Sequence, residues 1–343
     1  MGLQQALAAL ADGVSLTREE ARQAVGEVMD GCASQAQIGA LLIALKQKGE
    51  SLDEIVGFAA GMRERVSPVR ASRRPLLDIC GTGGAPCRVF NVSTAAAFIG
   101  AAGGVAVAKH GNRAMSGVCG SADVLEALGV ALSLCAEHCA RCIDEVGIGF
   151  LFAPMRHPAM RHAASARKEL GIRTIFNLVG PLTNPAGASL QVMGVSQPGL
   201  VDTAAMALRE LGSERAIVAH GAPGMAEIST LGETRIAEWT GDEQLKYRLS
   251  PRQLGLPGPG PSESELAPAS TPEQNAKLVR EALSGKDRGA AGAARRNLVA
   301  VNGAAALRLG LAIEGWPEAV DRAQSLISDG SALAALDRLI AFS

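Results

Sequence analysis

Hydrophobic positions recur at helical intervals along the first part of the chain. Ile38, Leu41 and Leu45 follow the spacing that places side chains on one face of a helix. Ser51-x-x-Glu54 has the spacing of a capping box, in which two side chains satisfy backbone N–H groups at a helix start. We therefore expect residues 1–67 to form a small helical domain.

The pattern changes after a basic segment that ends on Pro75. Short apolar runs then alternate with helical patterns such as 121–128 and 200–211. This alternation is typical of an α/β domain with a mainly parallel sheet, which we expect over residues 74–343. The runs that predict strands are 76–79, 105–108, 150–152, 190–195 and 216–219.

Residues 254–272 interrupt the alternation. This stretch holds five prolines and three glycines, a composition that predicts a surface loop rather than a helix or strand. Helical patterning resumes at Pro272 and continues to the C-terminus, so we assign the last segment to the α/β domain.

Composition and charge exclude several classes of protein. Apolar residues make up 48% and charged residues 20%, which favours a globular protein with a large aliphatic core. The 33 basic and 34 acidic residues give a net charge of −1, without the basic excess of a dedicated nucleic-acid-binding protein. We therefore expect no nucleic-acid partner, and any polyanion must be bound at a local site.

We also expect no membrane association and a cytoplasmic location. The strictly apolar stretch 95–108 is shorter than the roughly 20 residues that a membrane helix needs. The N-terminus has neither the basic nor the apolar region of a signal peptide. Seven cysteines, an odd number, fit reduced thiols in the cytosol.

The first segment with candidate chemistry is a glycine-rich turn after a predicted strand. Gly81-Thr82-Gly83-Gly84 is followed by Asn91-Val92-Ser93-Thr94, which opens an alanine-rich helix. Glycines let backbone N–H groups approach a phosphate, and a helix N-terminus adds partial positive charge. The turn therefore suits a pyrophosphate, although a tight strand-to-helix turn without a ligand has the same pattern.

A basic loop, 109–113, follows the next predicted strand. Lys109 and Arg113 can neutralise phosphate, while His110 and Asn112 offer neutral hydrogen bonds to a second substrate. Taken alone, the loop is equally compatible with a solvated basic turn.

Together these segments resemble those of the anthranilate phosphoribosyltransferase family. The resemblance runs from about residue 3 to the C-terminus and is densest between 76 and 195. The segments that carry it are 81–84, 91–94, 109–113, 120–129, 167–171 and 176–185.

The resemblance implies a fold related to that of the pyrimidine nucleoside phosphorylases. A small helical domain, completed by a helical segment near 158–180, would be hinged to a large α/β domain. The substrates would be phosphoribosyl pyrophosphate with Mg²⁺ and anthranilate or a similar aromatic acid. The family also implies a homodimer that forms through the helical domain.

The resemblance also implies a role for each matching residue. Arg167 has the planar guanidinium that can grip an acceptor carboxylate at two points. No side chain is expected to act as a catalytic acid or base, because an aniline amine is already neutral near neutral pH. The expected metal ligands are Ser93 and Glu227. Donor-binding residues are expected at Gly81, Thr82, Gly83, Gly84, Asn91, Ser93, Thr94, Lys109 and Ser116. Acceptor-binding residues are expected at His110, Asn112, Ala153, Pro154, His157, Arg167 and Gly180.

The chain departs from the family pattern on the donor and metal side. Acidic residues are replaced by Ala85 and Ala226, and two serines by Gly117 and Cys119. Each loss removes an oxygen ligand or a phosphate hydrogen bond. One interpretation is an enzyme with fewer Mg²⁺ contacts, in which Arg88 or Arg113 supplies positive charge.

The other interpretation is a divergent relative. It would act on a different aromatic acid, or bind a ligand or nucleic acid without catalysis. Nucleoside phosphorolysis on the same fold is disfavoured by the complete acceptor motif with Arg167. The principal hypothesis remains phosphoribosyl transfer to anthranilate.

Overall fold

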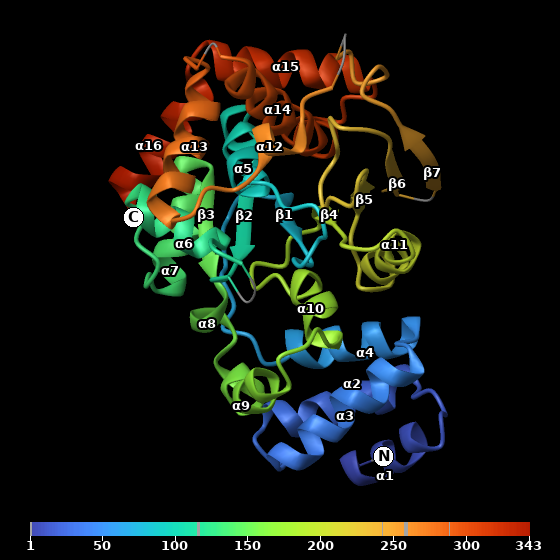
Figure 1. Ribbon diagram of the computed structural model, residues 1–343. Helices are drawn as coiled ribbons and strands as arrows, with labels where there is room; N and C mark the ends of the chain where they lie inside the picture. The colour runs from blue at the N-terminus through green and yellow to red at the C-terminus, as the bar shows by residue number, and fades with distance from the viewer. Residues whose placement is uncertain (1, 115–116, 242, 257–259, 288) are drawn as a thin grey trace.

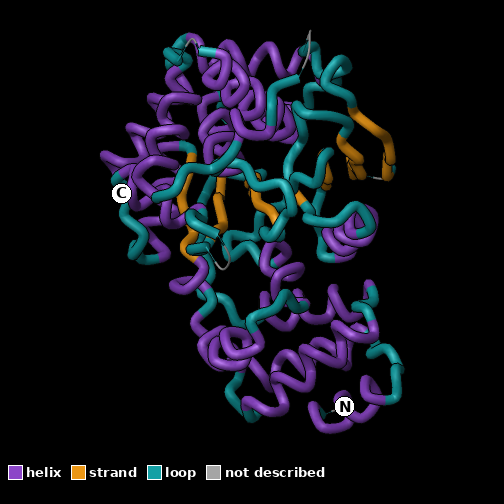
Figure 2. The backbone as a smooth tube through the Cα atoms, in the orientation of Figure 1, coloured by secondary structure: helices purple, strands orange, loops and turns teal. Residues whose placement is uncertain are grey.

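The computed structural model describes every residue except 1, 115–116, 242, 257–259 and 288. Helices of the N-terminal part gather in one lobe, and the sheet with the C-terminal helices forms the other (Figure 1). In the tube view the lower lobe contains helices and loops, while the strands lie in the upper lobe (Figure 2). The expected fold class, a small helical domain with a large α/β domain, is confirmed.

The helical lobe begins with four helices whose starts carry capping side chains at three of the four positions. In the last of them, the hydroxyl of Ser51 accepts the N–H of Glu54, and the carboxylate of Glu54 accepts the N–H of Ser51. Their bounds are α1 Leu3–Ala11, α2 Arg18–Met29, α3 Gln35–Lys48 and α4 Leu52–Arg63.

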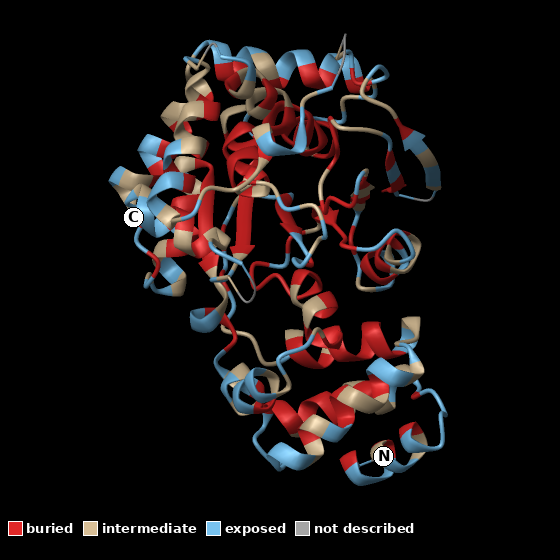
Figure 3. Ribbon diagram, viewed as in Figure 1, coloured by how far each residue is buried: buried red, intermediate tan, exposed pale blue. Residues whose placement is uncertain are grey.

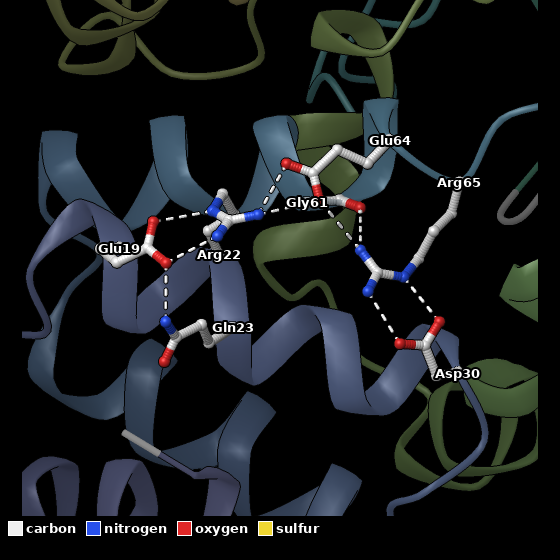
Figure 4. Close-up of polar contacts among 7 residues, drawn as sticks. All are labelled: Glu19, Arg22, Gln23, Asp30, Gly61, Glu64 and Arg65. Carbon is white, nitrogen blue, oxygen red and sulfur yellow. Dashed lines mark hydrogen bonds and ion pairs between the residues drawn. The ribbon is translucent and has the colours of Figure 1, made fainter.

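A network of charged side chains ties the outer faces of α2 and α4 together (Figure 4). Arg22 binds Glu19 on its own helix at 2.6 Å and Glu64 at 2.8 Å. Arg65 binds Asp30 at 2.7 Å. The network joins both ends of α2 to the C-terminal end of α4.

Two later helices pack against this lobe. They are α9 (Arg161–Leu170) and α10 (Ile175–Val179), and they share an apolar core with α2, α3 and α4. The ring of Phe176 in α10 meets that of Phe58 in α4 edge to face, with 6.3 Å between centroids. A segment from the middle of the sequence therefore joins the N-terminal helices.

The described residues of the second lobe form a seven-stranded sheet in the order β3-β2-β1-β4-β5-β6-β7. Strands β1 to β5 are parallel, and β6 and β7 add antiparallel pairs at one edge. The strands are β1 Leu76–Gly81, β2 Ala106–Gly111, β3 Ile148–Phe152, β4 Leu190–Gly194, β5 Arg215–Gly221, β6 Thr234–Thr240 and β7 Gln244–Leu249.

Two parts of this lobe differ from the sequence-based expectation. The sequence reading did not anticipate β6 and β7, because β7 lies at the sheet edge and has mostly polar or partly exposed side chains. The segment 254–272 is not simply a surface loop, since it contains the short helix α12 (Glu263–Leu266). Leu266 is fully buried, and its carbonyl accepts the N–H of Phe90 at 3.1 Å.

Buried helices cover the sheet. The central ones are α5 (Val92–Ala102) and α14 (Ala290–Leu311), which pack on each other within the main core (Figure 3). The remaining helical elements are α6 Ser121–Leu128, α7 Ala136–Arg141, η1 Cys142–Val146, α8 Ala153–Arg156, η2 Pro158–Met160, η3 Gly180–Leu182, α11 Leu200–Glu210, α13 Pro272–Ser284, α15 Trp316–Ser328 and α16 Ser331–Phe342.

Over the described part of the chain, no individual helix has both the length and the apolar character needed to cross a bilayer. The bent pair α14 and α15 passes that test only when the two helices are taken together.

Candidate active site at the carboxyl edge of the sheet

The strand order reverses between β1 and β4, and this switch point defines the site. In open parallel sheets, ligands bind beyond the carboxyl ends of the strands at such a point. Gly81 ends β1 and pairs with Gly194, which ends β4. A side chain on Gly194 would collide with the backbone carbonyl of Ala226, so the segment that carries Ala226 lies directly over the strand ends.

The turn after β1 is anchored through Thr82. Its N–H donates to Gly194 O at 2.9 Å, and its hydroxyl accepts the N–H of Ser196 at 3.1 Å. Gly83 and Gly84 follow with φ of 64° and 65°, the left-handed region that favours glycine. Neither glycine N–H has a hydrogen-bond partner among the described residues, so both are available to an anion.

The N-terminus of α5 lies just beyond this turn. Asn91 precedes the helix without capping it, and its amide instead donates to Cys119 O at 3.3 Å. The hydroxyl of Thr94 is buried and has no partner in the described part of the chain. Uncapped N–H groups at a helix start bind phosphate, and the half-buried Ser93 sits in this first turn.

Lys109 is almost fully buried between β1 and β2. Its ammonium donates to Ile79 O at 2.6 Å and to His110 O at 3.3 Å, next to the carboxylate of Asp78. Asp78 accepts the N–H of His110 at 3.1 Å, while its other oxygen has no partner among the described residues. Burial raises the pKa of Asp78, and the Lys109 charge opposes that rise. The side chain of Lys109 therefore holds the ends of β1 and β2 together through its hydrogen bonds to main-chain carbonyls.

Two histidines meet on the acceptor side. His110 lies near the end of β2, just before the loop that carries Asn112, and His157 follows α8, which begins at Ala153 and Pro154. The ring centroids of the histidines are 5.0 Å apart. Burial lowers the pKa of His157 to about 4 and holds that of His110 well below its usual value. Both rings are therefore neutral near neutral pH.

Arg167 presents a half-buried cation from α9. Its guanidinium lies 5.2 Å from the centroid of the Phe176 ring and forms no ion pair with any carboxylate of the described residues. Burial lowers its pKa. Gly180 begins a short helix, and a side chain there would meet no atom within 4 Å. An unpaired guanidinium on an aromatic ring favours a planar carboxylate ligand.

The expected metal ligands include one uncompensated carboxylate. Glu227 is half-buried, burial raises its pKa to about 7, and none of the described cations pairs with it. Such a carboxylate fits a cation. Among the described residues, no group of three or more His, Cys, Asp or Glu side chains is placed to hold a metal ion, so a magnesium ion would need oxygens from its substrate as well. Ser116 lies outside the described residues.

The two candidate compensating arginines differ in their contacts. Arg113 is bound by Asp123 at 3.0 Å and by Glu126 at 2.7 Å, so its charge is already neutralised. Arg88 is exposed and forms no ion pair within the described part of the chain. Its Nη1 lies 3.3 Å from the position that a Cβ of Gly117 would take, on the donor side.

Sequence reasoning gave no role to two charged residues at this edge. Asp78 interrupts an otherwise apolar strand, and this pattern could have marked it as a buried ionic group. Arg173 lies between two of the segments that carried the resemblance. Its guanidinium packs against Gly84 and donates to Thr82 O at 3.2 Å. Only the folded structure brings Arg173 to the glycine turn.

Comparisons with known proteins agree over nearly the whole chain. Residues 73–333 match the model described as "Glycosyl transferase family, a/b domain", and residues 4–66 match "Glycosyl transferase family, helical bundle domain". The chain is 46% identical over 338 residues to the anthranilate phosphoribosyltransferase of Rubrobacter xylanophilus, covering 98% of this chain and 96% of that protein.

Solved structures give the same result. The anthranilate phosphoribosyltransferase of Thermus thermophilus superposes with a TM-score of 0.90 at 44% identity and covers 98% of each chain. That of Saccharomyces cerevisiae in complex with PRPP and Mg superposes with a TM-score of 0.88 at 26% identity, over 99% of this chain and 97% of that one.

Proposed function

Because the chain belongs to the anthranilate phosphoribosyltransferases of the glycosyl transferase family, we propose how its own residues perform that reaction. The protein transfers the phosphoribosyl group of phosphoribosyl pyrophosphate to the amine of anthranilate, in tryptophan biosynthesis. The observation that carries the proposal is that the site offers two different kinds of binding group. The free N–H groups of Gly83 and Gly84 lie on the donor side, and the unpaired guanidinium of Arg167 lies on the acceptor side.

The donor occupies the switch point between β1 and β4. The N–H groups of Gly83 and Gly84 and the open N-terminus of α5 bind its phosphate oxygens, with Ser93 and Thr94 as hydroxyl donors. The ammonium of Lys109 holds the ends of β1 and β2 together through its bonds to Ile79 O and His110 O. Its positive charge also favours the binding of phosphate at these strand ends. The full donor set we propose is Gly81, Thr82, Gly83, Gly84, Asn91, Ser93, Thr94, Lys109 and Ser116.

The acceptor occupies the side formed by α8, α9 and the end of β2. Arg167 binds the carboxylate, and the neutral rings of His110 and His157 offer hydrogen bonds without attracting a second anion. The open space at Gly180 leaves room for the aromatic ring. The full acceptor set we propose is His110, Asn112, Ala153, Pro154, His157, Arg167 and Gly180.

Mg²⁺ binds with the donor, and Ser93 and Glu227 are the residues that would hold it. When bound, the ion neutralises charge on the pyrophosphate leaving group. The uncompensated carboxylate of Glu227 supports this assignment. Because Ala226 adds no second carboxylate, most of the ion's oxygens come from the substrate and water.

The reaction is a displacement at the anomeric carbon of the ribose. The amine lone pair of anthranilate forms the new C–N bond as the C–O bond to pyrophosphate breaks, and the nitrogen then loses one proton. The transition state is oxocarbenium-like, as in glycoside chemistry. The side chains supply position and charge stabilisation, so no catalytic acid or base is required.

We also propose the domain division 1–67 and 74–343, with a segment near 158–180 completing the helical domain.

A homodimer through the helical domain and a cytoplasmic location belong to the same proposal. Seven free cysteines support a reducing compartment. A hollow lined by Gln35, Ala36, Gly39, Ala166, Glu169 and Leu170 offers both small and polar residues for contact with a second copy. Light scattering after size exclusion tests the dimer.

The activity is tested by following anthranilate fluorescence with phosphoribosyl pyrophosphate and Mg²⁺. Consumption that requires both the donor and the metal supports the proposal. Reactions without donor, or with EDTA, serve as controls. Binding of both ligands without turnover would contradict it and favour a non-catalytic relative.

A further inference from the structure

Arg173 joins the two sides of the site. It lies in the connection between α9 and α10, which pack on the helical lobe, yet its side chain reaches the turn after β1. Its Nη2 donates to Thr82 O at 3.2 Å. A side chain on Gly84 would collide with its Nη1, so the guanidinium lies directly against the glycine turn.

The guanidinium of Arg173 is half-buried without a counter-ion. No carboxylate of the described residues pairs with it, and burial lowers its pKa. Removing a charge from water is unfavourable unless another group compensates it. One hydrogen bond to a carbonyl uses a single N–H of the five that a guanidinium carries, so the group retains donors for an anion.

Two of the neighbouring cations are already engaged, and Arg88, which is unpaired, is exposed to solvent. Lys109 donates to two carbonyl oxygens beside Asp78, and Arg113 is paired with Asp123 and Glu126. A diphosphate at the turn therefore meets Arg173 as a half-buried cation with free donors. The planar fork of an arginine matches two phosphate oxygens.

We propose that Arg173 is a donor-site residue, which contacts the diphosphate of the bound donor while holding the Gly83 and Gly84 turn through Thr82 O. The inference rests on the proposed function for the identity of the donor. It adds a contact from the α9–α10 connection, so a bound donor holds this connection against the turn after β1.

The decisive variant is Arg173→Gln, measured in the full chain. Glutamine keeps an N–H donor for Thr82 O but loses the charge and the fork. The matched control is Lys168→Gln, which removes the same unit charge from an exposed position on α9. Binding of inorganic pyrophosphate with Mg²⁺ is measured by calorimetry, without acceptor.

We expect Arg173→Gln to weaken pyrophosphate binding by about tenfold or more, as for loss of a charge-assisted hydrogen bond. Lys168→Gln should change it by less than about threefold, as for an exposed charge. Equal binding by Arg173→Gln and wild type would overturn the proposal, as would absence of pyrophosphate binding by the wild type.

A second measurement uses the wild type and does not depend on the folding of a variant. Phenylglyoxal modifies accessible arginines, and mass spectrometry locates the modified sites. We expect pyrophosphate with Mg²⁺ to protect Arg173 but not Arg161, which is exposed at the start of α9. Equal modification of Arg173 with and without pyrophosphate would contradict the inference. A wild type that binds pyrophosphate but leaves anthranilate unconsumed would instead refute the proposed function alone.

Discussion

The imidazole rings of His110 and His157 lie 5.0 Å apart at a tilt of 41°, although His110 belongs to β2 and His157 follows α8. Both residues are buried, and neither Nε2 has a hydrogen-bond partner among the described residues. Burial lowers the pKa of both rings, and His157 is lowered to about 4. Each neutral ring has a nitrogen atom that can form a hydrogen bond to a polar ligand. Protonation of these buried rings at low pH is unfavourable in the folded state.

The first prediction is a loss of stability between pH 6.5 and 4. An unfolded histidine has a pKa near 6.5, so over this interval the unfolded state binds more protons than the folded state. Stability is therefore fully present above about pH 6.5 and falls as the pH drops toward 4. Urea denaturation at a series of pH values measures the slope.

The variant His157→Asn should flatten this slope, since it removes one of the two buried imidazoles. Ala164→Asn is the matched control at an exposed position of α9 without a titratable group, and it should leave the slope as it is in the wild type. An unchanged slope in His157→Asn would contradict the assignment of a buried neutral ring.

The second prediction concerns Arg167 and the acceptor carboxylate. Arg167→Gln should raise the KM for anthranilate about 10- to 100-fold, as expected for loss of a hydrogen-bonded charge, with little change in the KM for the donor. Steady-state kinetics with each substrate varied gives both values. Lys168→Gln, the next residue of α9, is the control and should change neither.

An uncharged acceptor sharpens this test. Anthranilamide lacks the carboxylate, so the wild type should discriminate strongly against it, and Arg167→Gln should discriminate much less. A variant that still prefers anthranilate to the same degree would show that another group recognises the carboxylate.

Much of the fold could be predicted from local pattern. The five parallel strands coincide with short apolar runs, because strands buried on both faces are continuously apolar. Strands β6 and β7 could not be found in the same way. The edge strand β7 is largely exposed, and β6 places the charged residues Arg235 and Glu238 among its apolar positions. Leu266 was also missed, because proline and glycine around it suggest a loop while its own side chain completes the core.

The site was less accessible to sequence reasoning than the fold. The glycine turn and the helix start are contiguous segments, so their chemistry could be read locally. The contact of Arg173 with Thr82 O joins residues 91 positions apart, and no local pattern encodes it. Which of Arg88 and Arg113 is free likewise depended on Asp123 and Glu126, which the fold brings to Arg113 from helix α6.

The third prediction distinguishes those two arginines. Arg88→Gln should raise the KM for phosphoribosyl pyrophosphate by about tenfold, because it removes an unpaired cation beside the donor turn. Arg113→Gln should raise it by less than about threefold, since that charge is already neutralised. Initial rates over a range of donor concentrations measure both. Equal effects of the two substitutions would refute the distinction.

The fourth prediction restores an acidic residue at position 226. The Cβ of Ala226 lies 3.9 Å from the position that a Cβ of Gly81 would take, so an aspartate there would project toward the donor turn. Ala226→Asp should lower the Mg²⁺ concentration needed for half-maximal rate, because it adds an oxygen ligand beside Glu227. Ala226→Asn, of similar size but uncharged, should do so much less. An unchanged Mg²⁺ requirement in the aspartate variant would place the metal elsewhere.

The last prediction tests the packing on which the site depends. Gly194 must lack a side chain, because a Cβ would run into the backbone carbonyl of Ala226, which cannot rotate away as a side chain could. Gly194→Ala should lower the free energy of unfolding by about 1–3 kcal/mol, as in other overpacked sites. It should also weaken pyrophosphate binding, since the carbonyl of Gly194 holds the Thr82 N–H at 2.9 Å. Gly199→Ala is the control, because its Cβ would meet nothing within 4 Å, and it should change stability by less than about 0.5 kcal/mol. Urea denaturation and calorimetry measure the two effects, and wild-type values for Gly194→Ala in both would show that the segment over the strand ends can shift freely.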